Sequence, residues 1–96
     1  MPFMVLHTKT NQIFTCTLIN KYELSYYGIK YWEDENRALK EVNTFLVEQH
    51  VQHLDDWIVM EIDENLMKIG NVKVKNNPKY ELFWIDKQKL EAKLKE

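Results

Sequence analysis

The sequence predicts a two-layer α+β domain, in which a mostly antiparallel sheet carries the main helix, about residues 34–50, on one face. Three observations lead to this prediction. Segments rich in β-branched and aromatic residues are joined by short turns, one long segment has helical periodicity, and the elements follow the order βββ-α-β-(α)-β-β-α. The 96 residues have the length of one domain, and two Gly, two Pro and no internal repeat leave no room for a linker. We therefore expect residues 1–96 to form a single domain.

The first two predicted strands form a β-hairpin. Side chains alternate over residues 3–8, and the polar turn 9–12 contains Asn11, a residue type that tolerates left-handed backbone. The second strand, residues 13–19, is rich in β-branched and aromatic types. Its alternation places Phe14, Cys16 and Leu18 on one face. A thiol between apolar neighbours, with no base nearby in the sequence, is expected to be buried and inert.

An aromatic segment, Tyr22–Trp32, holds five of the twelve aromatic residues of the chain. We predict a third strand over about residues 25–32, and its alternation divides the aromatic side chains between two faces. One face carries Tyr27, Ile29 and Tyr31, and the other carries Tyr26, Gly28, Lys30 and Trp32. Only one set is needed for the core of a two-layer domain. Whether Tyr26 and Trp32 belong to the core or to a contact surface stays open at this point, with contact slightly favoured.

The main helix follows at once. Asp34 has the residue type of an N-cap, and acidic residues in the first turn favour the positive end of the helix dipole. Apolar residues then recur at helical spacing through Leu39, Val42, Phe45 and Leu46. This is the strongest helix prediction in the chain.

The second half is predicted as two strands and two shorter helical segments. Residues 57–62 and 80–85 read as strands, and residues 76–78 as a turn. Residues 63–75 have two interpretations: a short helix stopped by Gly70 and followed by a strand, or a helix continuing to Lys75, which Gly70 makes less favourable. Asp86 is predicted to cap a C-terminal helix that carries Leu90 and Leu94 four residues apart.

Charge is unevenly distributed along the chain. The net charge is −2, yet residues 33–64 carry ten acidic residues against Arg37 and Lys40, and residues 66–96 are rich in Lys. Complementation of these segments within one small domain is the simpler explanation, and separate faces for basic and acidic partners are the alternative. Lys outnumbers Arg twelve to one, a bias that AT-rich codons explain and that indicates a bacterial or phage source.

The motifs that the sequence lacks constrain the cellular compartment and the chemistry of the protein. The segment Met1–His7 has no cationic start, no apolar run approaches the about 18 residues of a membrane span, and a single Cys forms no internal disulfide. We therefore expect a cytoplasmic protein that does not contact a membrane. No glycine-rich phosphate loop and no nucleophile, metalloprotease or CxxC motif occurs, so the sequence predicts no enzyme and no cofactor.

The candidate metal ligands are His50, His53 and Asp55. They belong to an H-x-x-H-x-D-D segment, and a spacing of three would place both imidazoles on one side of a helix. No third strong ligand is evident unless His7 approaches in the fold. Because isolated His pairs near helix ends are common, we expect no metal.

Nucleic acid is the less favoured partner. The side chains of Tyr26, Lys30 and Trp32 would stack bases and neutralise phosphate, with Lys73, Lys75 and Lys79 extending the basic surface. The acids at 33–35 follow directly and would repel the backbone of a nucleic acid.

We therefore expect a small interaction or regulatory module that binds a protein partner or associates with itself as a homodimer. Its predicted interaction surface is Tyr26, Lys30 and Trp32. Two alternatives stay open: a nucleic-acid-associated factor that uses the Lys-rich C-terminal third, and a small metal-binding protein or enzyme around His50 and His53.

Overall fold

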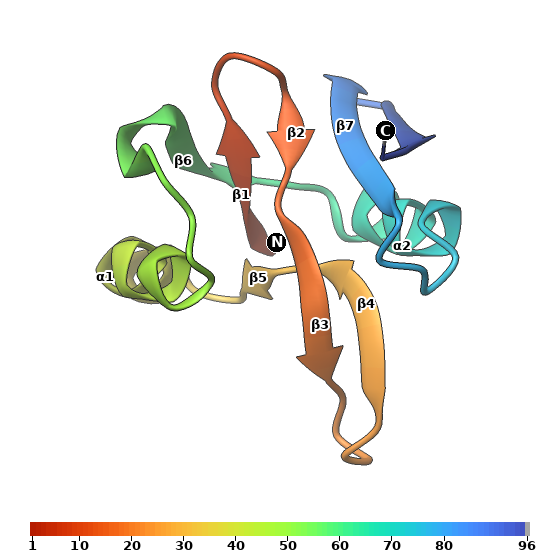
Figure 1. Cartoon of the computed structure of the whole chain (residues 1–96), viewed down its shortest axis with the longest axis horizontal. Coiled ribbons are helices and arrows are strands. Elements are labelled where there is room, and N and C mark those ends of the chain that lie inside the picture. The colour runs from red at the N-terminus through yellow and green to blue at the C-terminus, as the bar shows by residue number, and fades with distance from the viewer. Residues whose placement is uncertain (96) are drawn as a thin grey trace.

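A computed structural model describes residues 1–95 and confirms an α+β fold with mostly antiparallel strands and a helix packed on the sheet (Figure 1). The strands are β1 (Phe3–His7), β2 (Gln12–Ile13), β3 (Thr15–Ile19), β4 (Ser25–Ile29), β5 (Tyr31–Trp32), β6 (Trp57–Glu61), β7 (Tyr80–Asp86) and β8 (Lys89–Leu94). The helices are α1 (Glu35–Glu48), α2 (Glu64–Lys73) and a short 3₁₀ helix, η1 (Leu54–Asp56). Within the described residues, neither α-helix has the length and apolar character needed to cross a membrane.

The main sheet is organised around β1. One edge of β1 pairs with β6 over five residues, from Phe3 opposite Glu61 to His7 opposite Trp57. The other edge is shared, because β5 pairs with its first two residues and β2 pairs at Leu6. The sheet continues from β2 to β7 and β8, and all of these pairs are antiparallel.

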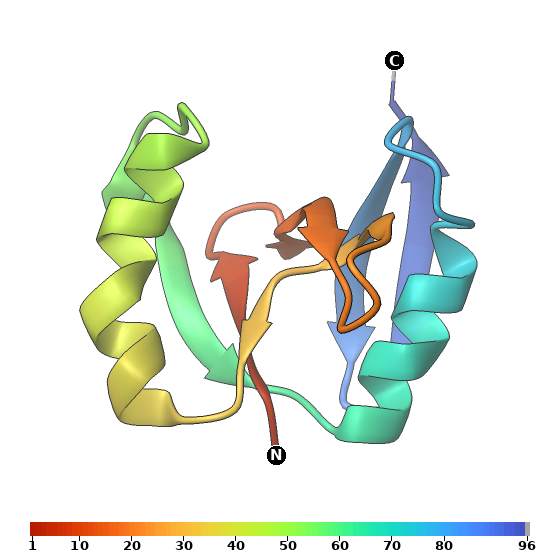
Figure 2. The same ribbon diagram turned by 90° about the horizontal axis from the view of Figure 1, so that it is seen from below.

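Side chains on the two faces of β1 belong to two different cores, and the two α-helices lie on opposite sides of the molecule (Figure 2). Met4 and Leu6 point into a core that includes residues of α2, whereas Val5 points into a core that includes residues of α1. We call these the α2-side core and the α1-side core. Each fully buried aliphatic side chain contributes about 1.5–3 kcal/mol relative to exposure. The prediction that the main helix packs on one face of the sheet is confirmed, and α2 packs mainly on β8 and β4.

The hairpin predicted over residues 3–19 forms only in part. Its turn is as expected, since Asn11 has a left-handed backbone with φ of 62°. The second strand, however, divides after Ile13. Ile13 pairs with β1, but residues 15–19 leave the sheet and pair with β4 in a separate two-stranded hairpin that projects from the body (Figure 1).

The predicted strand over 25–32 also divides, at Lys30. Residues 25–29 pair with β3, and residues 31–32 return to the edge of β1. The predicted alternation nevertheless holds: Tyr27 and Ile29 face the α2-side core, with Tyr31 packed against it, and Trp32 faces the α1-side core.

Residues Glu64–Lys73 form one helix, so the interpretation as a continuous helix holds and the alternative, a strand at Val72 and Val74, is wrong. Asp63 caps α2 as expected, its carboxylate accepting the backbone N–H of Leu66 at 3.1 Å. Gly70 lies within the helix because α2 approaches the sheet closely there. A Cβ at this position would lie 2.7 Å from Leu90 Cδ1 and 3.0 Å from Leu82 Cδ2.

The predicted C-terminal helix is wrong, because residues 89–94 form β8. Asp86 accepts the backbone N–H of Gln88 at 2.8 Å and so shapes a turn rather than a helix cap. Leu90 is fully buried and Ala92 packs beside it. The spacing of four between Leu90 and Leu94 had indicated a helix, but residues four apart also share one face of a strand.

Substitution Gly70→Ala is expected to destabilise the protein by about 1–2 kcal/mol, although alanine is normally favoured over glycine inside a helix. The added methyl group would meet three buried side chains, those of Leu90, Leu82 and Ile29. Urea unfolding followed by circular dichroism measures the change. Lys68→Ala, on the exposed side of the same helix, should stay within about 0.5 kcal/mol of the parent. A stabilised Gly70→Ala variant would show that the contact is looser than described.

Candidate interaction surface

The β3–β4 hairpin projects from the body of the molecule (Figure 1). Five cross-strand pairs join its strands, from Thr15 opposite Ile29 to Ile19 opposite Ser25. Its tip is held by Asn20, whose side-chain oxygen accepts the backbone N–H groups of Tyr22 at 2.9 Å and Leu24 at 3.1 Å. Glu23 completes the turn with left-handed backbone, φ 62°. The tip is therefore a defined turn, shaped by local hydrogen bonds.

The tip presents apolar side chains to solvent. Ile19 is 72% exposed, Tyr22 is 71% exposed and Leu24 is 62% exposed. Single exposed apolar residues are common on protein surfaces, but three within six positions at the end of a projecting hairpin form a patch. These residues escaped the sequence analysis because their exposure depends on the hairpin leaving the sheet. The sequence does contain one sign of this patch, because apolar residues lie on both sides of the Asn20 turn.

The outer edge of β4 is satisfied by side chains of α2 and the segment after it. The backbone N–H of Ile29 donates to Asn71 Oδ1 at 2.9 Å, and that of Tyr27 donates to Asn76 Oδ1 at 2.6 Å. Both N–H groups therefore point away from β3. No further strand can pair with β4 at these positions without displacing the two asparagines.

The outer edge of β3 has no such partner among residues 1–95. Hydrogen bonds at the two ends of the hairpin, Lys30 N–H to Phe14 O and Asn20 N–H to Leu24 O, fix which backbone groups face β4. Because hydrogen-bonded pairs alternate in antiparallel sheets, the N–H and C=O groups of Thr15, Thr17 and Ile19 point outward. No charged residue occurs between Ile13 and Ile19. This edge can accept another strand.

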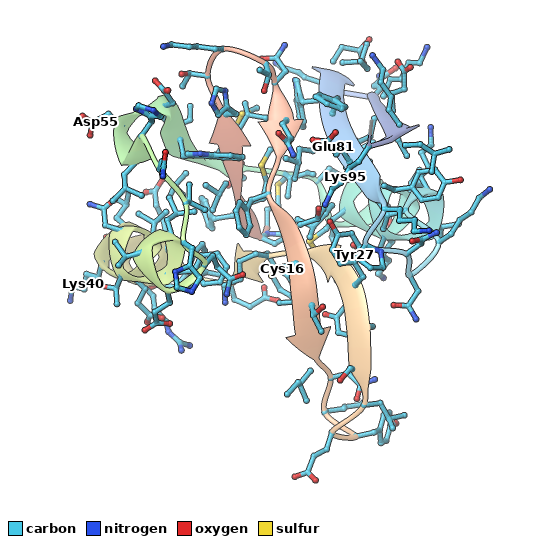
Figure 3. The ribbon with its side chains drawn as sticks, in the orientation of Figure 1. Cys16, Tyr27, Lys40, Asp55, Glu81 and Lys95 are labelled. Carbon is cyan, nitrogen blue, oxygen red and sulfur yellow. The ribbon has the colours of Figure 1, made fainter. Side chains whose placement is uncertain are left out.

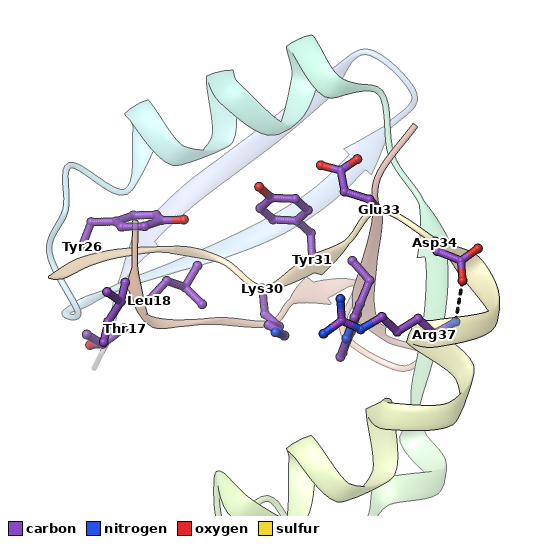
Figure 4. A pocket seen from close by; sticks show the side chains of 10 residues that line it. Thr17, Leu18, Tyr26, Lys30, Tyr31, Glu33, Asp34 and Arg37 are labelled. Carbon is purple, nitrogen blue, oxygen red and sulfur yellow. Dashed lines mark hydrogen bonds between the residues drawn. The ribbon is translucent and has the colours of Figure 1, made fainter. Parts of the chain in front are cut away.

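A groove of about 580 Å³ lies between the hairpin and the start of α1 (Figure 4). Its walls include Leu18 and Tyr26 from the hairpin, Tyr31 from β5, and charges of both signs from Lys30, Glu33, Asp34 and Arg37. Burial, followed by the nearby Tyr31 and Cys16, raises the pKa of the Tyr26 hydroxyl above its usual range. Tyr26 therefore stays neutral and offers the groove both a ring and a hydrogen-bonding hydroxyl.

Trp32, predicted as part of the contact surface, contributes its side chain to the α1-side core. It is only 4% exposed, and its indole N–H donates to Glu41 Oε1 at 3.3 Å. Arg37 also donates to Glu41, at 2.7 Å, and these two hydrogen bonds lower the pKa of the Glu41 carboxyl. Lys30 places its ammonium 4.7 Å from the Trp32 ring centroid and 5.0 Å from that of Phe45. The structure thus brings Tyr26, Lys30 and Trp32 to one groove, where Tyr26 is the accessible aromatic side chain.

Cys16 is buried at the centre of the hairpin base, as expected (Figure 3). Burial raises the pKa of its thiol, and the positive charge of Lys30 opposes this only in part. The thiol is therefore protonated at neutral pH and contributes packing.

Of the candidate metal ligands, His50 and His53 lie between α1 and η1, and Asp55 lies in η1. His50 and His53 both have left-handed backbone, with φ of 60° and 57°, so the helical spacing that would align their imidazoles is absent. His7 packs edge-on against Trp57 at 4.9 Å, and its Nδ1 accepts the backbone N–H groups of Lys9 and Thr10. Among the residues described, no three His, Cys, Asp or Glu side chains come close enough to hold a metal ion.

Two lysines of the predicted basic surface, Lys73 and Lys75, line a second surface groove of about 620 Å³ together with Lys89 and Glu91. Lys73 Nζ donates to the backbone oxygen of Leu90 at 2.8 Å, and Lys75 lies over the ring of Tyr80 at 5.6 Å. These lysines do not line the hairpin groove and so do not extend its basic character.

Comparison with known proteins gives no independent guide to this surface: no family model, no curated protein and no solved structure matches the chain. The functional argument therefore depends on the geometry of the hairpin and its groove.

Removing the Trp32 side chain should destabilise the protein by about 3–5 kcal/mol, because it leaves a cavity in the α1-side core and removes one of the two hydrogen bonds to Glu41. Tyr26→Ala should cost about 1 kcal/mol, since that ring is only half-buried. Tyr22→Ala, at the exposed tip, is the control and should have almost no effect. Urea unfolding of the three variants measures the differences. Equal losses for Tyr26→Ala and Trp32→Ala would contradict the division into surface and core.

Proposed function

We propose that this chain is a protein-interaction module, acting in the cytoplasm, that binds an extended segment of another polypeptide along the free edge of β3. The observation that carries the proposal is the outward-facing backbone of Thr15, Thr17 and Ile19, which has no partner among residues 1–95. Strand addition to such an edge is a common mode of protein recognition.

Backbone pairing would supply affinity with little sequence specificity. Each new backbone hydrogen bond contributes about 0.5–1.5 kcal/mol net. Burial of the exposed apolar side chains at the tip would add about 25 cal/mol for each Å² removed from water. Both contributions arise from the same hairpin, so a partner strand can engage them together.

Specificity would come from the groove. Leu18, Tyr26 and Tyr31 offer apolar surface and hydroxyl groups, and Arg37 and Glu33 offer charges of opposite sign. An arrangement of this kind suits alternate side chains of an extended peptide, which fall into pockets beside the strand that carries them.

A protein partner fits this surface better than nucleic acid does. Glu33 and Asp34 line the groove beside the cations and would repel phosphate. The Trp32 ring is covered by Lys30 and Phe45, so it offers no free face on which a base could stack.

Asp55, one of the candidate metal ligands, lies on a different part of the molecule from the hairpin (Figure 3).

A photo-cross-linking amino acid in place of Tyr22 should form adducts of defined mass in cells that produce the chain, because the tip lies at the proposed contact. The matched control carries the same amino acid in place of Lys40, which is exposed on α1 (Figure 3). Adducts with another protein or with a second copy of the chain both support an interaction module. Adducts absent from the Tyr22 position, or equal at the two positions, would overturn the proposal.

A further inference from the structure

We infer that the polypeptide bound at the β3 edge is a second copy of the same chain, paired antiparallel about a two-fold axis at Thr17. This inference depends on the proposed function, since it names the partner of the same surface. It is argued from the way the outer strands are protected, from the register that a two-fold axis imposes, and from the charges around the tip and groove.

The longer outer strands differ in how they exclude unwanted pairing. The edge of β4 is occupied by Asn71 and Asn76. β8 carries Lys89, Glu91 and Lys93. Acidic residues stand at both ends of β6. Charges and capping groups of this kind are the usual protection of sheet edges.

β3 lacks both forms of protection. Its sequence around the edge, from Ile13 to Ile19, has no charge, no proline and no glycine, and it is rich in β-branched residues. Such a segment is prone to pair with its own copies when it is exposed. Stable pairing of the β3 edge removes this hazard, and a partner that is available to every molecule is another copy of the same chain.

A two-fold axis at Thr17 gives a register without conflict. Thr17 falls opposite Thr17 of the second copy, and Ile19 falls opposite Thr15. These outward-facing residues are the ones whose backbone groups are free, and their side chains are uncharged and β-branched, which favours cross-strand packing. Pairing about this axis occupies the free β3 edge of both copies, so the assembly is a closed dimer.

The same register carries each hairpin tip past Thr15 of the other copy and toward its groove. The tip carries Lys21 and Glu23, one charge of each sign, beside the exposed Tyr22 and Leu24. The groove likewise carries both signs, with Arg37 against Glu33 and Asp34. Mixed charges of this kind allow complementary contacts on both sides of a two-fold axis. The apolar tip residues of both copies lose solvent exposure in the same step.

Charge reversal at Thr17 tests the two-fold register. Thr17→Lys and Thr17→Glu each place like charges against each other across the axis, which should weaken dimerisation by more than tenfold. Mixing the two variants in equal amounts pairs opposite charges and should restore the dimer. Sedimentation equilibrium across a dilution series measures the three dissociation constants, and circular dichroism confirms that each variant is folded.

Ser25→Lys is the matched control. Ser25 lies on β4 directly opposite Ile19, is exposed, and gains the same charge away from the proposed contact. It should leave the dimer unchanged. A monomeric parent, a dimer that survives Thr17→Lys, or a mixture that stays monomeric would overturn the inference. If the parent is monomeric while the Tyr22 position still cross-links to another protein, the proposed function stands and only the identity of the partner is overturned.

Discussion

The arrangement of the whole chain depends on β1, which is paired along both edges and buried on both faces. Its second edge is shared between β2 and β5, which pair with successive residues of the same strand. The chain between these two short strands, residues 14–30, consequently has no place on β1. It leaves the sheet, pairs with itself as β3 and β4, and returns at Lys30, whose N–H bonds to Phe14 O across the base. The projecting hairpin is thus a consequence of how β1 is filled.

This geometry also explains why some residues of the aromatic segment are buried and others are exposed. Residues near the base of the hairpin return to the body, where α1 covers Trp32 and Glu41 satisfies its indole N–H. Tyr26 lies farther along the hairpin and stays at the groove, and Tyr22 lies at the tip in solvent. α2 supports one edge of the hairpin through Asn71 and Asn76 and leaves the other free. The open edge and the exposed tip are therefore held on a supported base, which the proposed docking surface requires.

Local patterns predicted those elements whose signals are complete within a short window. The helix after Asp34 has a capping residue and apolar periodicity, and α1 begins and ends close to the predicted bounds. Leu90 and Leu94, by contrast, fit one face of a helix and one face of a strand equally well, and β7 decided between them. Gly70 has a helix-breaking residue type, but its role is set by Leu82 and Leu90, which lie far along the chain.

The candidate site was predicted only in part, for a related reason. The aromatic density of residues 22–32 drew attention to this region, and the alternation of Tyr27, Ile29 and Trp32 was confirmed. The division of the strands after Ile13 and at Lys30 follows from pairing with β1 and has no local signal. Because the sequence does not reveal this division, it also does not reveal the free edge of β3 or the exposure of Ile19, Tyr22 and Leu24.

Amide hydrogen exchange on β3, measured by NMR across a range of protein concentrations, tests the central claim most directly. The N–H groups of Cys16 and Leu18 face β4 and should be protected at every concentration. Those of Thr17 and Ile19 face outward, so they should exchange freely in dilute solution and become protected as the concentration rises. Free exchange of Thr17 and Ile19 at all concentrations would contradict the account, as would protection that does not depend on concentration.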